Sequence, residues 1–557
     1  MPTITIDGKT CEFEQGKTII QVAHENDVHI PSYCYHDALS IVASCRICLA
    51  EVWAPNPRND NTLEPIPKLV PTCQTQATDG MVVYTDSPKA TQGSKSVMEY
   101  LLINHPLDCP VCDQAGECLL QDYSYSHGRG ISRFEEAKVK QPKKDVGPNI
   151  LLYADRCIMC TRCVRFTREI THTNELIVDG RGNQEQIDVF PGRALDNDLA
   201  SNVIDLCPVG ALLDKDFLFA KRVWDLTITP SIDGITSSGD NITIEHADNT
   251  IYRLKPRTNM DVNKWWITDE VRYGWKFIHS TDRLPAPQRR REGALADTQW
   301  ARALTDLVEA THESSRPLAL LVSPMLTCED AYLLASACLS LDPDTILAVG
   351  PIPIDGQDKT FPPNADESHP NHFVKRAEKC PNARGVRRVL EALSAGKPVL
   401  DFNAFVTRLA DAGSVLLTGN FPSQWHTDDL LAQLRRDDLF VALCDTLASP
   451  LVETADVVLP SCTWAEKAGT FENANNRLQA FEQAIRPLEQ SLPEGQIATH
   501  LEHLAQGNAD TPPALFNASN TRTIMSDTNP QLARFTTDVH MPKQPSPRES
   551  DMPLIEL

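Results

Sequence analysis

The distribution of cysteine constrains this chain more than any other feature. Of its 17 cysteines, 12 lie before residue 208, and none lies between Cys207 and Cys328. The N-terminus, MPTITIDGKT, has neither the basic run nor the apolar run of a secretory signal, so we expect the thiols to be reduced. Reduced cysteines gathered this densely indicate metal ligands rather than disulfides.

Length and charge limit the remaining possibilities. The 557 residues are enough for three to five domains at about 150 residues each. No stretch approaches the ~18 consecutive apolar residues of a membrane span, so no transmembrane helix is expected. Acidic residues exceed basic ones by 23, which argues against a nucleic-acid binder because phosphate contacts need clustered Lys and Arg.

The character of the chain changes along its length. Short strands and turns fill the first part, beginning with a hairpin that turns at Asp7 and Gly8. After Trp224, β-branched residues and turns predict a small sheet. The basic, Pro-containing stretch at 284–293 is interpreted as a linker. From Trp300 onward, helical and apolar runs alternate, which indicates an α/β parallel sheet.

The first group of cysteines has the spacing C-x10-C-x2-C-x24-C: Cys34, Cys45, Cys48 and Cys73. Four thiolates from one compact loop and one return strand can hold a [2Fe–2S] cluster. Four thiolates also suit a structural zinc ion, so zinc remains an alternative for this group.

The second group has the spacing H-x3-C-x2-C-x5-C: His105, Cys109, Cys112 and Cys118. One imidazole in place of a thiolate removes a negative charge from a [4Fe–4S] cluster and is expected to raise its reduction potential. Zinc held by three thiolates and one imidazole is again the alternative.

The third group is a tight triplet followed by a Cys-Pro pair, C-x2-C-x2-C-x43-C-P: Cys157, Cys160, Cys163 and Cys207. Such a run wraps one corner of a [4Fe–4S] cluster. No second triplet exists in the chain, so Cys207 is expected to complete the same site. Zinc is a poor alternative, because a triplet this tight is unusual in zinc sites.

The three groups closely resemble, in order and spacing, the large iron–sulfur subunits of respiratory complex I. The resemblance is carried by long strings: SCRICLAEV at 44–52, HPLDCPVCDQAGECLLQD at 105–122, DRCIMCTRCVRFTREI at 155–170, GRG at 180–182 and LCPVGAL at 206–212. Farther along, ETADVVLPSCTWAEKAGTFENANNRLQ at 453–479 is similar to a signature of molybdopterin oxidoreductases.

The resemblance implies a multidomain α+β and α/β protein. Its expected parts are a β-grasp 2Fe-2S ferredoxin-like domain at 1–90, a His-ligated 4Fe-4S segment at 91–135, a ferredoxin-like 4Fe-4S domain at 136–225, and a degenerate molybdopterin-oxidoreductase-like α/β domain at 226–490. A Pro-rich tail at 491–557 lacks periodicity and is expected to be extended or partly disordered.

Departures from the family also carry information. Some bacterial relatives bind a fourth 4Fe-4S cluster at the start of the molybdopterin-like domain, but the matching stretch here has no cysteine, so no fourth cluster is expected. No recognisable metal-ligating residue or further cofactor-clamping domain is visible, so no molybdenum cofactor is expected either. The remaining cysteines are expected to be small core residues: Cys11, Cys328, Cys338, Cys380, Cys444 and Cys462.

The family resemblance implies an electron-relay subunit of NADH:quinone oxidoreductase, without substrate chemistry of its own. Its expected partners are an FMN-bearing, NADH-oxidising subunit, the small 2Fe-2S partner of that subunit, and the subunits of the connecting arm. It is then expected at the cytoplasmic side of the inner (plasma) membrane, which it touches only through the complex.

Three other functions are compatible with parts of the sequence. NAD-linked hydrogenases and formate dehydrogenases use similar N-terminal modules for electron transfer, although the inactive-looking molybdopterin-like region favours complex I. A molybdenum or tungsten oxidoreductase needs a metal ligand that is not visible. A zinc scaffold leaves twelve ligands in redox-type spacing unexplained.

Overall fold

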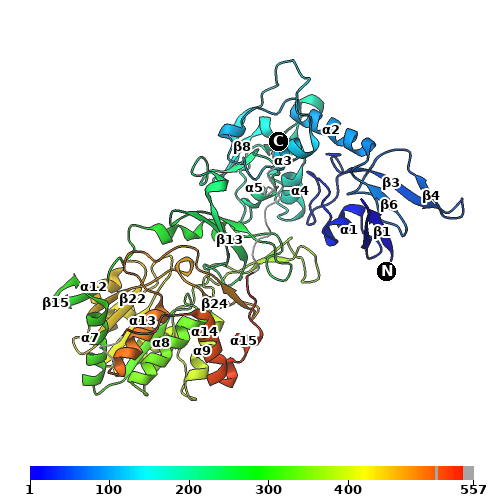
Figure 1. The fold of residues 1–557 in the computed structure, drawn as a ribbon. Helices are drawn as coiled ribbons and strands as arrows, with labels where there is room; N and C mark the ends of the chain where they lie inside the picture. The colour runs from blue at the N-terminus through cyan, green and yellow to red at the C-terminus, as the bar shows by residue number, and fades with distance from the viewer. Residues whose placement is uncertain (508–511, 543–557) are drawn as a thin grey trace. The chain divides into compact units, whose positions relative to one another are not determined.

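The computed structural model describes residues 1–507 and 512–542, which divide into two compact units (Figure 1). The first unit contains residues 1–226 together with residues 361–372. The second contains residues 227–360 and the described chain from residue 373 onward. Every predicted metal ligand therefore belongs to the first unit.

The first unit begins with a six-stranded sheet in the order β2-β1-β6-β3-β4, with β5 paired to β3. The predicted hairpin is confirmed: β1 and β2 are antiparallel, and Asp7 and Gly8 turn it with φ of 46° and 85°. One helix packs its apolar residues on this sheet, as expected for a β-grasp domain. The elements are β1 (Thr3–Ile6), β2 (Lys9–Glu12), α1 (Ile19–Glu25), β3 (Leu49–Asn56), β4 (Thr62–Pro65), β5 (Val70–Pro71) and β6 (Val82–Tyr84).

The rest of the first unit consists of short helices and two small sheets, one in the order β11-β8-β7 and one formed by β9 and β10. Short elements of this kind bury little apolar surface, and metal sites commonly stabilise such folds. The elements are α2 (Pro88–Leu102), α3 (Leu119–His127), β7 (Lys143–Asp145), β8 (Ile150–Tyr153), α4 (Arg162–Glu169), β9 (Leu176–Asp179), β10 (Gln186–Val189), α5 (Asn202–Leu206) and β11 (Leu212–Asp214).

The second unit begins with the small sheet predicted after Trp224, an antiparallel meander in the order β12-β13-β14. The prediction of a linker at 284–293 is wrong. Gln288–Arg291 forms a strand near the edge of the large sheet and pairs with the strands on both sides of it, Ala294–Asp297 and Val457–Pro460. The elements are β12 (Thr227–Ile232), β13 (Asn241–Ala247), β14 (Thr250–Pro256), α6 (Asp269–Tyr273), β15 (Gln288–Arg291) and β16 (Ala294–Asp297).

The predicted parallel sheet is confirmed as a seven-stranded sheet in the order β16-β15-β23-β22-β21-β17-β18, whose last five strands are parallel. Alternate residues of β17 enter two different apolar clusters, so the sheet is buried on both faces. The elements are α7 (Trp300–Glu313), β17 (Leu318–Val322), α8 (Cys328–Leu341), β18 (Ile346–Val349), β19 (Lys359–Phe361), β20 (Phe373–Lys375), α9 (Ala383–Leu393), α10 (Phe402–Arg408), β21 (Ser414–Thr418), α11 (Asp428–Leu434), β22 (Phe440–Asp445), α12 (Pro450–Thr454), β23 (Val457–Pro460), β24 (Gly469–Glu472) and β25 (Leu478–Phe481).

The tail differs from the expectation of extended or disordered chain. It contains α13 (Glu494–Ala505), α14 (Ala518–Thr528) and α15 (Arg534–Thr537), while residues 508–511 and 543–557 lie outside the described residues. Ile497, Leu501, Met525 and Phe535 are buried in the apolar cluster that includes α8. Ile497 and Leu501 are four residues apart and lie on one face of α13, but the short helices are separated by Pro-rich chain, so no period is sustained along the tail. Packing on the sheet domain stabilises these short helices.

The six cysteines expected to be core residues are all buried, which confirms that interpretation: Cys11, Cys328, Cys338, Cys380, Cys444 and Cys462. Among the described residues, no helix is both long and apolar enough to cross a membrane.

Candidate metal centres

The first group of ligands converges in the ferredoxin-like domain. Cys34, Cys45 and Cys48 lie on the irregular chain between α1 and β3, and Cys73 follows β5. The thiols are in hydrogen-bonding contact with one another, Cys34 with Cys45 and Cys73, and Cys48 with Cys73. Thr72 fixes the return strand by donating from its backbone N and its Oγ1 to the carbonyl of Cys48, at 3.1 and 3.0 Å.

These contacts change the acidity of the four thiols. Hydrogen bonds from Cys45 and Cys73 lower the pKa of Cys34, and a hydrogen bond from Cys73 lowers the pKa of Cys48 to about 7. The donors change in the opposite direction, because their hydrogen bonds to Cys34 raise the pKa of Cys45 and Cys73. The arrangement therefore favours thiolate at part of the site, and thiolate is the form that binds iron.

In the second group, Cys109 lies in a short 3-10 turn, Cys112 ends that turn, and Cys118 caps α3. Burial is the main cause that raises the pKa of Cys112, and it raises the pKa of Cys118 to about 12. Burial also lowers the pKa of His105 to about 4, so its imidazole is neutral at neutral pH. Its Nδ1 is buried without a hydrogen-bond partner in the part of the chain that the structure describes. A neutral imidazole with an unused buried nitrogen is suited to metal ligation.

Residues far along the chain shape this second site. A Cβ added to Gly210 would lie 2.2 Å from the Sγ of Cys112, so the close approach requires glycine. Arg156, which precedes Cys157, pairs with Asp108 at 2.9 Å and lies 3.9 Å from the ring centroid of Tyr153. The ion pair connects the segment of the second group to that of the third.

The four thiols of the third group line one small cavity. A tight turn presents the triplet, with Met159 and Thr161 at φ of 54° and 59°, and Cys163 lies in the first turn of α4. Cys207 reaches the same cavity from the end of α5. The cavity is lined by the four thiols, by Thr161 and Arg162, and by apolar side chains: Leu152, Ile158, Ile187, Val209, Ala211 and Leu212.

Burial raises the pKa of all four thiols of the third group, to about 11 for Cys160, where the charges of Arg162 and Arg165 act in the opposite direction. Four buried thiolates would repel one another, and a cationic group in the cavity would offset that repulsion. Together with the unpartnered His105 nitrogen and the close approach at Gly210, this donor chemistry fits iron–sulfur clusters at the predicted positions.

A site for a single metal ion requires side chains that converge on one point. Within residues 1–507 and 512–542, no three His, Cys, Asp or Glu side chains form a group that could hold one metal ion. In an iron–sulfur cluster, the ligands bind different iron atoms and need not converge on one point.

Sequence reasoning missed the arginines of the metal-binding region. Arg162 and Arg165 are buried, and they donate to backbone carbonyls of both the first and the third group. The sequence did offer a signal: both arginines lie in the string CTRCVRF, beside cysteines that are expected to be buried. A buried arginine needs hydrogen-bond partners, so these two positions could have been predicted to contact other parts of the site.

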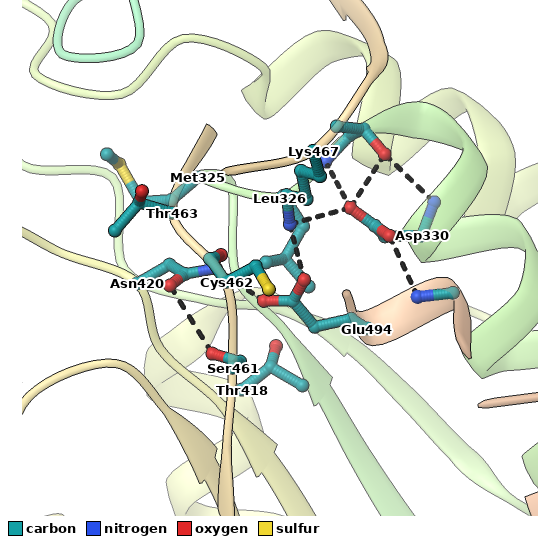
Figure 2. Close-up of polar contacts among 12 residues, drawn as sticks. Met325, Leu326, Asp330, Thr418, Asn420, Ser461, Cys462, Thr463, Lys467 and Glu494 are labelled. Atoms are coloured by element: carbon teal, nitrogen blue, oxygen red, sulfur yellow. Dashed lines mark hydrogen bonds and ion pairs between the residues drawn. The ribbon is translucent and has the colours of Figure 1, made fainter. Parts of the chain in front are cut away.

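In the second unit, the carboxyl ends of the parallel strands lead to a buried ionic cluster (Figure 2). Lys467 pairs with Asp330 at 2.8 Å and with Glu494, and all three side chains are almost fully buried. The backbone N of Gly495 donates to Asp330 at 2.8 Å, and Asn420 donates to Glu494. Ligands commonly bind at this edge of α/β sheets, but here the charged groups are paired with one another.

Family models match the chain in five successive segments. They are described as a 2Fe-2S iron–sulfur cluster binding domain (residues 1–88), the NADH-ubiquinone oxidoreductase-G iron–sulfur binding region (95–133), the NADH-quinone oxidoreductase subunit 3 ferredoxin-like domain (147–213), an NDSU1/NuoG-like 4Fe-4S domain (226–276) and molybdopterin oxidoreductase (382–501). The fourth of these covers a stretch without any cysteine.

Curated relatives carry names from one enzyme. The mitochondrial NADH-ubiquinone oxidoreductase 78 kDa subunit of Neurospora crassa is 44% identical over 309 residues, which is 55% of this chain and 40% of the relative. An NADH-quinone oxidoreductase subunit of Rickettsia felis is 36% identical over 336 residues, 60% of this chain and 48% of the relative. The alignments thus span less than half of each relative's length.

One solved structure, an NAD+-reducing [NiFe]-hydrogenase in the H2-reduced state, is 28% identical and covers 40% of this chain and 91% of its own, with a TM-score of 0.35. The named relatives and the ordered iron–sulfur models agree with each other. Over these segments, the chain is similar to the large iron–sulfur subunits of NADH-quinone oxidoreductase.

Proposed function

We propose that this chain is an electron-relay subunit of NADH:quinone oxidoreductase, which takes electrons from a flavin-bearing subunit and passes them towards the quinone-reducing arm. The observation that carries the proposal is the gathering of three separate ligand groups in one unit, in the order of three iron–sulfur family models. Relatives named as subunits of this oxidoreductase support it.

The proposed ligand sets are those of the three groups. A [2Fe–2S] cluster is assigned to the first group, Cys34, Cys45, Cys48 and Cys73. Two [4Fe–4S] clusters are assigned to His105, Cys109, Cys112 and Cys118, and to Cys157, Cys160, Cys163 and Cys207. When bound, such clusters supply reversible one-electron chemistry. The chain itself positions the ligands, excludes water by burial, and places charge beside them.

We propose that the chain binds neither a molybdenum cofactor nor a fourth iron–sulfur cluster. Segment 226–276 offers no cysteine to a further cluster. In the molybdopterin-like region, Lys467, Asp330 and Glu494 use their charges on one another at the strand ends. This self-pairing supports a structural role for the second unit.

The proposed partners are the FMN-bearing subunit, its small 2Fe-2S partner and the connecting-arm subunits. The proposed location is the cytoplasmic side of the inner (plasma) membrane, within the peripheral arm of the complex. The names of the relatives support assembly into such a complex.

Metal and acid-labile sulfide analysis with low-temperature EPR, on anaerobically purified full-length protein, tests the proposal. One [2Fe–2S] and two [4Fe–4S] clusters give about 10 iron and about 10 sulfide per chain. About 14 iron would reveal a fourth cluster, and zinc without sulfide would refute the redox assignment. Stoichiometric molybdenum would refute the structural role of the second unit, and co-purification with a nickel–iron subunit would refute the assignment to NADH:quinone oxidoreductase.

A further inference from the structure

Two buried arginines join the first ligand group to the third. Both belong to α4, the helix that carries Cys163. The Nη2 of Arg165 donates to the carbonyl of Cys34 and, at 3.2 Å, to the carbonyl of Cys160. A single guanidinium group therefore binds the backbone of one ligand from each site.

The second arginine repeats this connection. The Nη2 of Arg162 donates to the carbonyl of Tyr35, which follows Cys34, and its Nη1 lies 3.5 Å from the carbonyl of Leu206, which precedes Cys207. The side chain of Arg162 also lines the cavity that the third group surrounds. Both arginines thus contact the backbone of the two ligand groups.

The positive charges of both arginines are buried and not neutralised by direct pairing. The residues are 9% and 3% exposed, and the acceptors of their hydrogen bonds are backbone carbonyls. In the described part of the chain, neither forms an ion pair with a carboxylate. The nearest acidic neighbour on the helix, Glu169, accepts from Ser40 and pairs with Arg168 at 3.0 Å.

We propose that Arg162 and Arg165 form a pair of buried positive charges shared by the first and third sites, and that their charge raises the reduction potentials of both clusters. The proposal rests on the ligand sets given under the proposed function. A cluster held by thiolates becomes more negative when it is reduced, so a buried cation beside it stabilises the reduced form. If the two arginines only held the two ligand segments together through hydrogen bonds, their positive charge would not be needed.

Redox titration of the full-length holoprotein, followed by EPR, distinguishes an effect of the arginine charge from an effect of the hydrogen bonds that hold the two segments together. In Arg165→Gln, we expect the ratio of reduced to oxidised cluster at a fixed potential to fall about tenfold at both sites, equivalent to about 59 mV for a one-electron couple. Arg165→Lys retains the charge and is expected to stay close to wild type. Arg168→Gln is the matched control, because this charge lies on the same helix but its side chain is 59% exposed.

Unchanged potentials in an Arg165→Gln protein with full iron content would overturn the proposal. If that variant loses its clusters, Arg165→Lys decides: wild-type potentials support the charge effect, and potentials lowered at both sites contradict it. Absence of clusters from the wild-type protein would instead refute the ligand sets. The potentials are measured without partners, so an incorrect client complex leaves this test unaffected.

Discussion

At the residue scale, burial keeps the His105 imidazole in the form that the proposed ligand role requires. Its imidazole is held neutral by a pKa of about 4, caused first by burial and then by the charges of Arg156 and Lys138. A neutral ring needs to lose no proton before its free nitrogen binds a metal. The same burial would be costly for a histidine that had no partner, since an unsatisfied buried nitrogen destabilises the fold.

We expect His105→Ala to remove the signal of one [4Fe–4S] cluster or to change its potential. If the cluster is lost, iron falls by about 4 atoms per chain. Iron analysis and EPR check this result. His172→Ala, at an exposed position in the same unit, is the control and should retain the wild-type spectrum. An unaltered spectrum in the His105 variant would exclude His105 as a ligand.

Glu494 makes a pH-dependent contribution to stability. Burial raises its pKa from 4.5 to about 7, against the opposing charge of Lys467. The folded protein therefore binds this proton more tightly than the unfolded chain does. The stabilisation is complete below about pH 4.5 and is lost as the pH rises towards about 7, a change on the order of 3 kcal/mol.

Glu494→Gln should remove that dependence. We expect the melting temperature of the variant, relative to wild type, to increase between pH 5 and pH 8, because Gln has no proton to lose. Scanning calorimetry at several pH values measures the difference. The exposed Glu482→Gln serves as the control and should show a constant difference. A pH-independent offset for Glu494→Gln would contradict the assigned titration.

At the scale of elements, the tail helices show how packing can create structure where sequence periodicity is weak. In α15, Phe535 is 1% exposed and lies in the same apolar cluster as α8. The short α15 would not be stable alone, since isolated helices of this length do not persist in water. Its stability therefore comes from burial against the sheet domain.

Phe535→Ala should destabilise the second unit by about 3–5 kcal/mol, through lost apolar burial and the cavity left behind. Denaturant unfolding followed by circular dichroism measures the effect. Leu515→Ala, at a position 88% exposed, is the matched control and should change stability by less than about 0.5 kcal/mol. Equal effects of both substitutions would show that the tail is not packed on the core.

At the scale of the whole molecule, the proposed metal ligands and the large apolar core belong to different units. All twelve proposed ligands lie in residues 1–226, whereas the seven-stranded sheet and its two apolar clusters lie in the second unit. The first unit contains many short elements, so with the proposed ligand sets we expect it to depend more on bound clusters, because bound metal contributes directly to folding free energy.

Removing the clusters by anaerobic chelation should therefore affect the two units unequally. We expect calorimetry to show a lower or absent transition for the first unit and an unchanged transition for the second. Phe535→Ala identifies the second transition, because only that one should shift in the variant. A parallel shift of both transitions after metal removal would contradict independent stabilisation.

Local sequence predicted the ligand groups and determined the fold class. Spacings such as C-x2-C-x2-C act within one turn of chain, and the alternation of helical and apolar runs reports the parallel sheet directly. The contact of Arg165 with Cys34 joins residues 131 positions apart, and that of Gly210 with Cys112 joins residues 98 positions apart. The strand at 288–291 and the tail helices likewise depend on distant partners. Only the tertiary structure decided these features, because their free energy comes from burial and pairing that no local pattern encodes.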